Sequence, residues 1–403
     1  MVEIEFSYIG DSPEDVQRFP QLIEDFQQSY RATVHLRALT WEQAWTELLD
    51  VALRGKGPDV SQIGDTWVSS FVGMNALRPF SPQEMAAMGG KAAFAPATHY
   101  SMSLPDDTKV WSVPWTSYIY LICYRKDILQ KTGIDEKSAF GSPEALNQTI
   151  LQLKAAGVEI PWLMPSGPAP YNDLLHMAAS WVWGMGGDFI SPDGKKAIFN
   201  QPAAFKALRT FLELYRYLPP NANLSIDECV QRFANGEAAM TIADVRSASS
   251  IHEFGATPQV TDNLGTANFS SVPWVGGSNL VVWRHTQISA EKERAALAWI
   301  NYLTSDAGQL KFAQLIGTLP ARASALSVTL PAGHPLKSTL EQAGKTGRGY
   351  PKIGLWQRIE LQLSLEIGEI IKAIWADPDV NIEAQLHQHL DYLARRFDLA
   401  LTY

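Results

Sequence analysis

The most constraining feature of this sequence is a repeated change of hydrophobic period in its first third. Val2–Ile9 alternates apolar and polar side chains with the period of two that is typical of a β-strand, until Gly10 breaks the pattern. Two further strand-like segments, Val34–Leu39 and Pro58–Gly64, each follow a stretch whose apolar residues recur at helical spacing. Strands that alternate with helices predict mostly parallel sheets with helices on both faces. We therefore expect an α/β fold.

Helix boundaries are also marked in the sequence. Thr40 is expected to cap a helix, with Gln43 at the capping-box position and Gly55 just past the last turn. Ser225 and Glu228 form the same capping-box pattern in the second half of the chain. These residues predict helices that begin at about 41 and 226.

The composition excludes several kinds of partner and site. A chain of 403 residues is long enough for two ordinary domains. Its net charge of -9 argues against nucleic acid, because phosphate binding needs a basic surface. Cys123 and Cys229 are too few for a disulfide framework or a four-thiolate zinc site. His387 and His389 are two residues apart and would point in different directions on a helix, so they do not indicate a zinc site. We expect neither a metal nor a cofactor.

The N-terminal residues bear on the location of the protein. Met1–Glu3 leads straight into a strand-like segment without a basic start, an apolar stretch or a small-residue cleavage site. Either the protein is cytoplasmic, or a secretion signal has been removed from it. No stretch approaches the roughly 18 consecutive apolar residues that a membrane span requires.

Several segments spread over nearly the whole chain carry recognisable motifs. They are Gly57–Trp67, Ala76–Phe80, Lys109–Trp115, Tyr124–Leu129, Phe233–Met240, Trp274–Leu280, Ala298–Ser305, Gly317–Arg322 and Pro351–Trp356. The most specific of them reads Trp-Val-Gly-Gly-Ser-Asn-Leu, at Trp274–Leu280. Taken in this order, the segments resemble those of the bacterial extracellular solute-binding proteins of the maltose-binding class.

The resemblance implies a particular architecture. Members of this class have the type II periplasmic-binding-protein fold, in which two α/β lobes are joined by chain crossings and close about a hinge on a ligand between them. Residues 1–115 and 278–321 would then form the first lobe, and residues 116–275 and 322–403 the second. The crossings are expected near 115–118, 274–277 and 319–324, where glycine or proline residues allow the chain to turn.

The resemblance also implies a function. The chain would be the substrate-binding protein of an ABC importer, a monomer that captures a carbohydrate, expected to be an oligosaccharide, and delivers it to a membrane permease without catalysing a reaction. It would be periplasmic or extracellular, free or lipid-anchored, with its signal peptide removed. Two alternatives remain: a glycoside hydrolase or lyase with an aromatic cleft, and a cytoplasmic α/β interaction protein.

Candidate ligand residues follow from the chemistry of sugars. A sugar presents C–H faces and hydroxyl edges, so its site needs aromatic platforms and fixed polar groups. Loops after the strands of a parallel sheet line such a crevice, and small residues let backbone approach a ligand. The expected ligand residues are Asp11, Trp41, Asp65, Thr66, Trp67, Trp115, Tyr118, Trp181, Arg246, Trp274, Gly276, Gly277, Tyr350 and Trp356.

Some of these residues have an equally ordinary structural interpretation. Trp41 and Trp181 lie on predicted helices, where a ring more often packs into the core. Asp11 suits a turn, and Asp65 suits a helix cap. Arg246 stands where many members of the class carry tryptophan. Its five N–H donors would suit an acidic or heavily hydroxylated sugar, or an ion pair with a carboxylate across the cleft.

Overall fold

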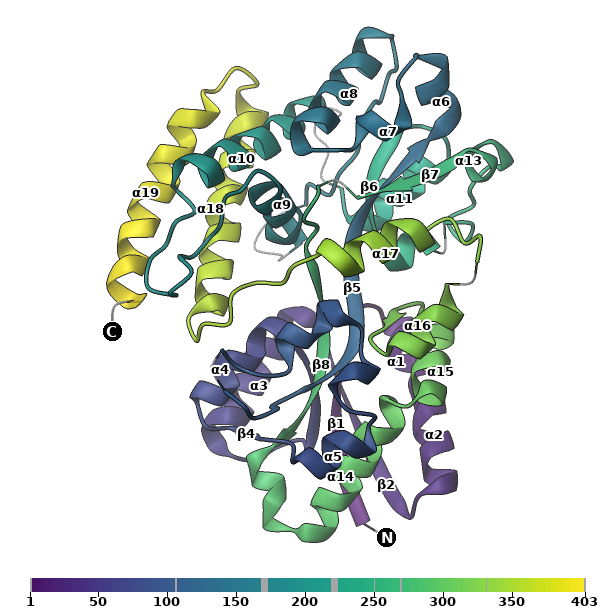
Figure 1. The fold of residues 1–403 in the computed structure, drawn as a ribbon, viewed down its shortest axis with the longest axis vertical. Coiled ribbons are helices and arrows are strands. Elements are labelled where there is room, and N and C mark those ends of the chain that lie inside the picture. The colour runs from purple at the N-terminus through teal and green to yellow at the C-terminus, as the bar shows by residue number, and fades with distance from the viewer. Residues whose placement is uncertain are drawn as a thin grey trace. The chain divides into compact units, whose positions relative to one another are not determined.

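The computed structural model describes residues 2–105, 107–167, 173–218, 224–249, 251–268, 270–330 and 332–401. The chain divides into two units. Figure 1 shows the chain coloured by residue number from the N-terminus to the C-terminus. Unit 1 consists of Met1–Tyr118, Val275–Ala332 and Lys352–Trp356, and unit 2 of Ile119–Trp274, Gly333–Pro351 and Gln357–Tyr403. Each unit is therefore built from three separate stretches of sequence.

The sheet of unit 1 contains the strands that are predicted from the start of the sequence. Its strands are β1 (Val2–Ile9), β2 (Ala32–Leu39), β3 (Val60–Gly64), β4 (Leu77–Arg78), β8 (Val275–Trp283), β9 (Leu319–Pro320) and the part of β5 (Val113–Arg125) that ends at Tyr118. Strand β1 lies between β2 and β3 and is parallel to both. Strand β8 returns beside β3 in the antiparallel direction and also pairs with β4.

Helices cover both faces of this sheet. They are α1 (Pro13–Arg18), α2 (Pro20–Ser29), α3 (Trp41–Arg54), α4 (Val68–Gly73), α5 (Pro82–Ala87), α14 (Ala290–Leu303), α15 (Asp306–Ile316) and α16 (Ala323–Thr329). Alternate residues of β8 enter two different cores. Leu280 and Val282 pack with residues of α2, α14 and α15, whereas Val281 and Trp283 pack with residues of α3 and α4. Burial on both faces of the sheet is the arrangement that the sequence predicts.

Unit 2 has a smaller sheet and more helix. Its strands are the remainder of β5, β6 (Met240–Asp244) and β7 (Leu264–Ala267), and both β6 and β7 are antiparallel to β5. Its helices are α6 (Lys126–Lys131), α7 (Glu136–Ala139), α8 (Pro143–Ala155), α9 (Asp173–Gly184), α10 (Pro202–Glu213), α11 (Ile226–Ala234), α12 (Val245–Ser249), α13 (Pro258–Asp262), α17 (Lys337–Thr346), α18 (Trp356–Ala376) and α19 (Ile382–Leu401). Figure 1 shows α19, in yellow, beside α10.

The α/β fold is confirmed, with differences in detail. Parallel pairing holds for β1 with β2 and with β3, whereas β8 is antiparallel to β3, and β6 and β7 are antiparallel to β5. The capping box of Ser225 and Glu228 is present at α11. Thr40 precedes α3, but its side chain makes no capping hydrogen bond to the described residues of that helix. Gly55 ends α3 in the left-handed conformation, as predicted.

The unit boundaries differ from the expected lobe boundaries at four places. Residues 116–118, residue 275, and residues 322–332 and 352–356 belong to unit 1, although the resemblance placed them in the second lobe. Helix α16 explains one of these differences, because it packs on α15 and β9 of unit 1. Lys352–Trp356 is held to unit 1 by hydrogen bonds that are described below.

Candidate functional site

The carboxyl ends of three neighbouring strands bring predicted ligand residues together in unit 1. Asp11 follows β1, Trp41 follows β2 and Asp65 follows β3, and β1 lies between the other two strands. The indole Nε1–H of Trp41 donates a hydrogen bond of 2.7 Å to Asp11 Oδ1. Loops at this edge of a parallel sheet are the usual place for a ligand crevice. Two of the predicted residues are thus in direct contact there.

The tryptophans at this edge are not equally accessible. Trp67 is only 3% exposed, because the edges of Trp41 and Trp45 meet its ring at centroid distances of 5.7 and 5.4 Å. Gly64 packs against it so closely that a Cβ there would lie 3.2 Å from the ring. Trp41 is 38% exposed. Of Trp41 and Trp67, it is therefore Trp41 that has a ring accessible to a ligand, and Trp67 packs against it.

Asp65 is a buried carboxylate at the same edge. The hydroxyl of Tyr100 and the backbone N–H of Thr66 donate hydrogen bonds to it. Burial raises the pKa of Asp65 to about 7, although both hydrogen bonds and the positive charge of Lys352 act to lower this pKa. Asp65 consequently changes its charge near neutral pH, which an exposed aspartate does not.

Lys352 lies in a short segment that is tied to unit 1. Its Nζ donates to the Ser103 carbonyl at 2.5 Å, and the hydroxyls of Ser69 and Ser70 donate to the carbonyls of residues 353 and 354. Burial lowers the pKa of Lys352 to about 8, with repulsion from Lys91 acting in the same direction and Asp65 opposing it. Trp356, at the end of this segment, is fully buried.

A second group of aromatic residues surrounds Trp274 in unit 2. The ring of His176 stacks on Trp274 with a centroid distance of 4.0 Å and an interplanar angle of 9°. Tyr120 and Tyr350 lie at centroid distances of 5.8 and 6.1 Å from the same indole. The Trp274 backbone N–H donates to Ser180 Oγ at 2.8 Å. One face of Trp274 is therefore occupied by the protein itself.

His176 connects this cluster to buried polar groups. Its Nδ1 shares a hydrogen bond of 2.9 Å with the Tyr350 hydroxyl, and its Nε2 lies 3.9 Å from Glu360 Oε1. Burial lowers the pKa of His176 to about 3. Tyr350 itself is 3% exposed and also contacts Trp183. The guanidinium carbon of Arg348 lies 4.8 Å from the centroid of the Trp183 ring.

We expect His176 to make the protein less stable in acid. Its pKa is about 3 in the folded chain and about 6.5 in the unfolded chain, so between these values the unfolded chain binds more protons. The free energy of unfolding should therefore fall as the pH drops from 6 to 4, by about 1 kcal/mol per pH unit from this residue. Urea unfolding across this pH range measures the slope. In the His176→Gln variant the slope should be smaller by that amount, and an unchanged slope would contradict the assignment.

Other predicted ligand residues lie in core positions. Trp115 is fully buried in unit 1, where its ring stacks on Phe312 at 4.2 Å and meets the edges of Phe6 and Phe19. Trp181 is fully buried in unit 2 and meets the edge of Phe211 at 5.2 Å. Their rings are enclosed by other side chains, so neither has a face open to a ligand.

The remaining predicted residues lie in strands or directly after them. Tyr118 is half-buried in β5, and Arg246 is half-buried in α12, directly after β6. Gly276 and Gly277 are in β8. A Cβ at Gly277 would overlap the Thr116 carbonyl oxygen, so the small residue here permits a close approach between two strands of the protein.

Sequence reasoning missed Tyr100, His176 and Lys352. Tyr100 lies in the 3₁₀ turn Pro96–Ser101 and His176 in α9, and neither follows a strand. Lys352 lies between two aromatic residues that the sequence did single out, Tyr350 and Trp356, and inside the segment Pro351–Trp356 that carries part of the resemblance, so its position is the signal that could have indicated it.

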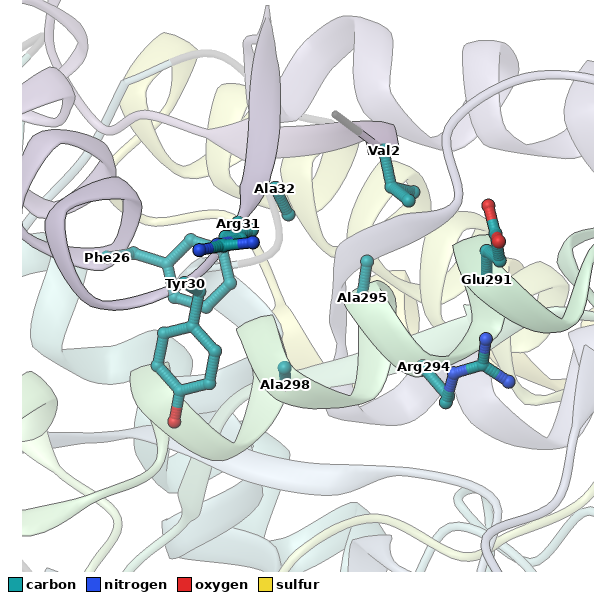
Figure 2. Close-up of a pocket in the computed structure, with 9 residues that line it drawn as sticks. All are labelled: Val2, Phe26, Tyr30, Arg31, Ala32, Glu291, Arg294, Ala295 and Ala298. Atoms are coloured by element: carbon teal, nitrogen blue, oxygen red, sulfur yellow. The ribbon is translucent and has the colours of Figure 1, made fainter.

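A pocket of about 340 Å³ lies at the opposite end of the unit 1 strands (Figure 2). Val2 and Ala32, near the starts of β1 and β2, line it together with Ala295 and Ala298 of α14. Figure 2 shows Ala295 and Ala298 between the side chains of Tyr30 and Arg294. None of the predicted ligand residues lines this pocket.

Within the described residues, no cluster of three or more His, Cys, Asp or Glu side chains is arranged to hold a metal ion. No helix in the described part of the chain has the length and the apolar character that crossing a membrane requires.

Comparison with known proteins gives consistent matches. A model of the bacterial extracellular solute-binding protein family matches residues 21–334. The diacetylchitobiose binding protein DasA of Streptomyces coelicolor is 23% identical over 87% of this chain and 80% of its own length. The sn-glycerol-3-phosphate-binding periplasmic protein UgpB of Escherichia coli K12 is 22% identical over 80% of this chain and 75% of its own length. The structure of the sugar-binding protein MalE from Xanthomonas citri matches with a TM-score of 0.80 and 21% identity, over 99% of this chain and 97% of that one.

Proposed function

This chain belongs to the bacterial extracellular solute-binding protein family, and we propose that it is the carbohydrate-binding component of an ABC importer. The observation that carries the proposal is the edge of the unit 1 sheet, where the exposed ring of Trp41 lies beside Asp11 and the buried carboxylate of Asp65 follows the next strand. An aromatic face with carboxylates near it suits the C–H face and the hydroxyl edges of a sugar.

Related proteins support this choice of ligand. DasA is named for binding diacetylchitobiose, and the Xanthomonas citri protein is described as sugar-binding. UgpB is named for sn-glycerol 3-phosphate, so a phosphorylated polyol belongs in any ligand screen. We further propose that the protein acts outside the cytoplasm, delivers its ligand to a membrane permease and leaves the ligand chemically unchanged. That the same ligand contacts unit 2 and closes a hinge stays a prediction from the resemblance.

A thermal-shift screen with product analysis tests the function. The protein is incubated with maltose, N,N′-diacetylchitobiose, further oligosaccharides and sn-glycerol 3-phosphate. A carbohydrate present at 100 times its Kd should raise the free energy of unfolding by about 2.7 kcal/mol and leave no product. Product formation would indicate an enzyme. A response to sn-glycerol 3-phosphate alone, or to no compound, would contradict the carbohydrate assignment.

Trp41→Ala is expected to weaken the binding of the responding sugar about tenfold, because a stacked ring contributes roughly 1 kcal/mol or more. Isothermal titration calorimetry measures this loss. Trp375→Ala is a matched control, since Trp375 on α18 has nearly the same exposure, 37% against 38% for Trp41. Equal affinities of the two variants would remove Trp41 from the site.

A further inference from the structure

Among the described residues, two acceptors lie within reach of the Tyr100 hydroxyl, which carries one proton. It lies within hydrogen-bond reach of Asp65 Oδ2 and also 3.1 Å from the carbonyl oxygen of Val275. A hydroxyl donates one strong hydrogen bond at a time, and an ionised carboxylate is a better acceptor than a carbonyl. Which acceptor receives the proton of Tyr100 therefore depends on whether Asp65 is ionised.

Protonation of Asp65 reverses the direction of its bond to Tyr100. A protonated carboxyl group has an O–H of its own, which it can donate to the Tyr100 oxygen. The hydroxyl proton of Tyr100 is then available to the Val275 carbonyl. One proton enters from solvent onto Asp65, Tyr100 stays neutral, and only the donors and acceptors change. Val275 is the first residue of β8 and directly follows Trp274, where the chain passes from unit 2 to unit 1.

Lys352 is placed to influence this change. Its ammonium group lies 5.5 Å from the centroid of the Tyr100 ring and is held by the Ser103 carbonyl. Within the described part of the chain, Lys91, which is exposed, also acts on Lys352 and lowers its pKa. His99, next to Tyr100, contacts the Phe94 carbonyl. Lys352 is thus the cation that acts on Asp65, and its charge favours the ionised carboxylate.

We propose that Asp65, Tyr100 and Lys352 form a proton-operated switch, in which Lys352 is a positioning residue that keeps Asp65 ionised as the acceptor for a ligand hydroxyl. In the ionised state the carboxylate accepts from Tyr100 and Thr66 and has further lone pairs for the ligand. In the protonated state one oxygen becomes a donor to Tyr100 and the ligand loses an acceptor. The part of this inference that concerns ligand affinity rests on the proposed function, whereas the titration of Asp65 does not.

The pKa values agree with this geometry. Burial raises the pKa of Asp65 to about 7, and the charge of Lys352 opposes this rise. A pKa of about 7 lies within the pH range that an extracytoplasmic protein meets. The pKa of Lys352 is about 8, lowered mainly by burial, so Lys352 is charged when Asp65 titrates. Removing this charge should move the titration of Asp65 to higher pH.

The first arm of the test needs no ligand. The carboxyl ¹³C resonance of Asp65, assigned by its loss in Asp65→Asn, is followed in the full-length protein labelled with ¹³C-aspartate. We expect a titration midpoint near pH 7 for Asp65 in the unchanged protein. In Lys352→Met this midpoint should move upward by about half a pH unit or more, and in Lys352→Arg, which keeps the positive charge, it should again lie near pH 7. Lys109→Met is the matched control, since Lys109 also lies 5.5 Å from an aromatic centroid, that of Trp111. A midpoint near 4, or equal midpoints in the Lys352→Met and Lys109→Met variants, would overturn the proposal.

The second arm measures affinity for maltose and for N,N′-diacetylchitobiose between pH 6 and pH 8. With a midpoint near 7, binding should be roughly tenfold weaker at pH 6 than at pH 8, and Lys352→Met should shift this profile to higher pH. A sugar that binds with equal affinity at both pH values would overturn the role of the switch in binding while the proposed function stands. If neither sugar binds at any pH, that result counts against the ligand class, and the titration of Asp65 in the first arm decides the switch.

Discussion

Replacing Gly277 by alanine is expected to leave little folded protein. A Cβ at this position would overlap the carbonyl oxygen of Thr116 and lie 3.0 Å from its carbonyl carbon. Both groups belong to the backbone of unit 1, where the Ser278 N–H donates to Thr116 Oγ1, so no flexible side chain can move aside. We expect a loss of about 3 kcal/mol or more in the free energy of unfolding. Soluble yield and the urea midpoint followed by circular dichroism measure it.

The control for this prediction is a glycine with free space around it. Gly344 lies inside α17, and a Cβ there would meet no atom within 4 Å. Gly344→Ala should be neutral or stabilising by up to about 1 kcal/mol, because alanine favours a helix interior over glycine. A urea midpoint for Gly277→Ala close to that of the unchanged protein would show that β8 and β5 can separate without cost.

Local signals were enough to predict much of the fold. The alternation in Val2–Ile9 marks β1, and Gly55 ends α3, because each depends on a few neighbouring residues. The capping box of Ser225 and Glu228 is also a local signal, because the two residues are close together in the sequence. Thr40 shows the limit of this reasoning, since its side chain makes no capping bond within the described part of α3. A capping residue type gives a hydroxyl the opportunity to cap, but the loop geometry decides whether it does.

The candidate site could be predicted only where it follows the strands. Asp11, Trp41 and Asp65 come after three strands whose order places their ends together, and the sequence indicated all three. It could not indicate that Trp67 is buried while Trp41 is exposed, because both follow strands and the difference comes from packing against Trp45.

Partners that are distant in sequence were beyond prediction for a related reason. Tyr100 reaches Asp65 from a 3₁₀ turn, and His176 reaches Trp274 from α9. Neither pair has a spacing that a periodic pattern would show, and each exists only because separate elements pack together. The sequence alone suggests that Gly276 and Gly277 let the backbone approach a ligand, whereas at Gly277 the close approach is to the backbone of Thr116.

Replacing Trp274 by alanine is expected to destabilise unit 2 strongly. The indole is 5% exposed, stacks on His176 and lies beside Tyr120 and Tyr350. Removing a buried tryptophan typically costs about 3–5 kcal/mol, and here the loss also leaves one face of His176 without a partner. Urea unfolding followed by circular dichroism measures the change. Trp274→Phe keeps an aromatic ring beside His176 and should recover most of the loss.

A double-mutant cycle separates the ring stack from the rest of this cost. If Trp274 and His176 stabilise each other through their contact, the losses of Trp274→Ala and His176→Ala should fall short of additivity in the double variant by about 0.5–1.5 kcal/mol. Additive losses would show that each ring packs independently. A Trp274→Ala protein with unchanged stability would show that the indole contributes nothing to the core, and a role confined to the ligand would then be the better account of this residue.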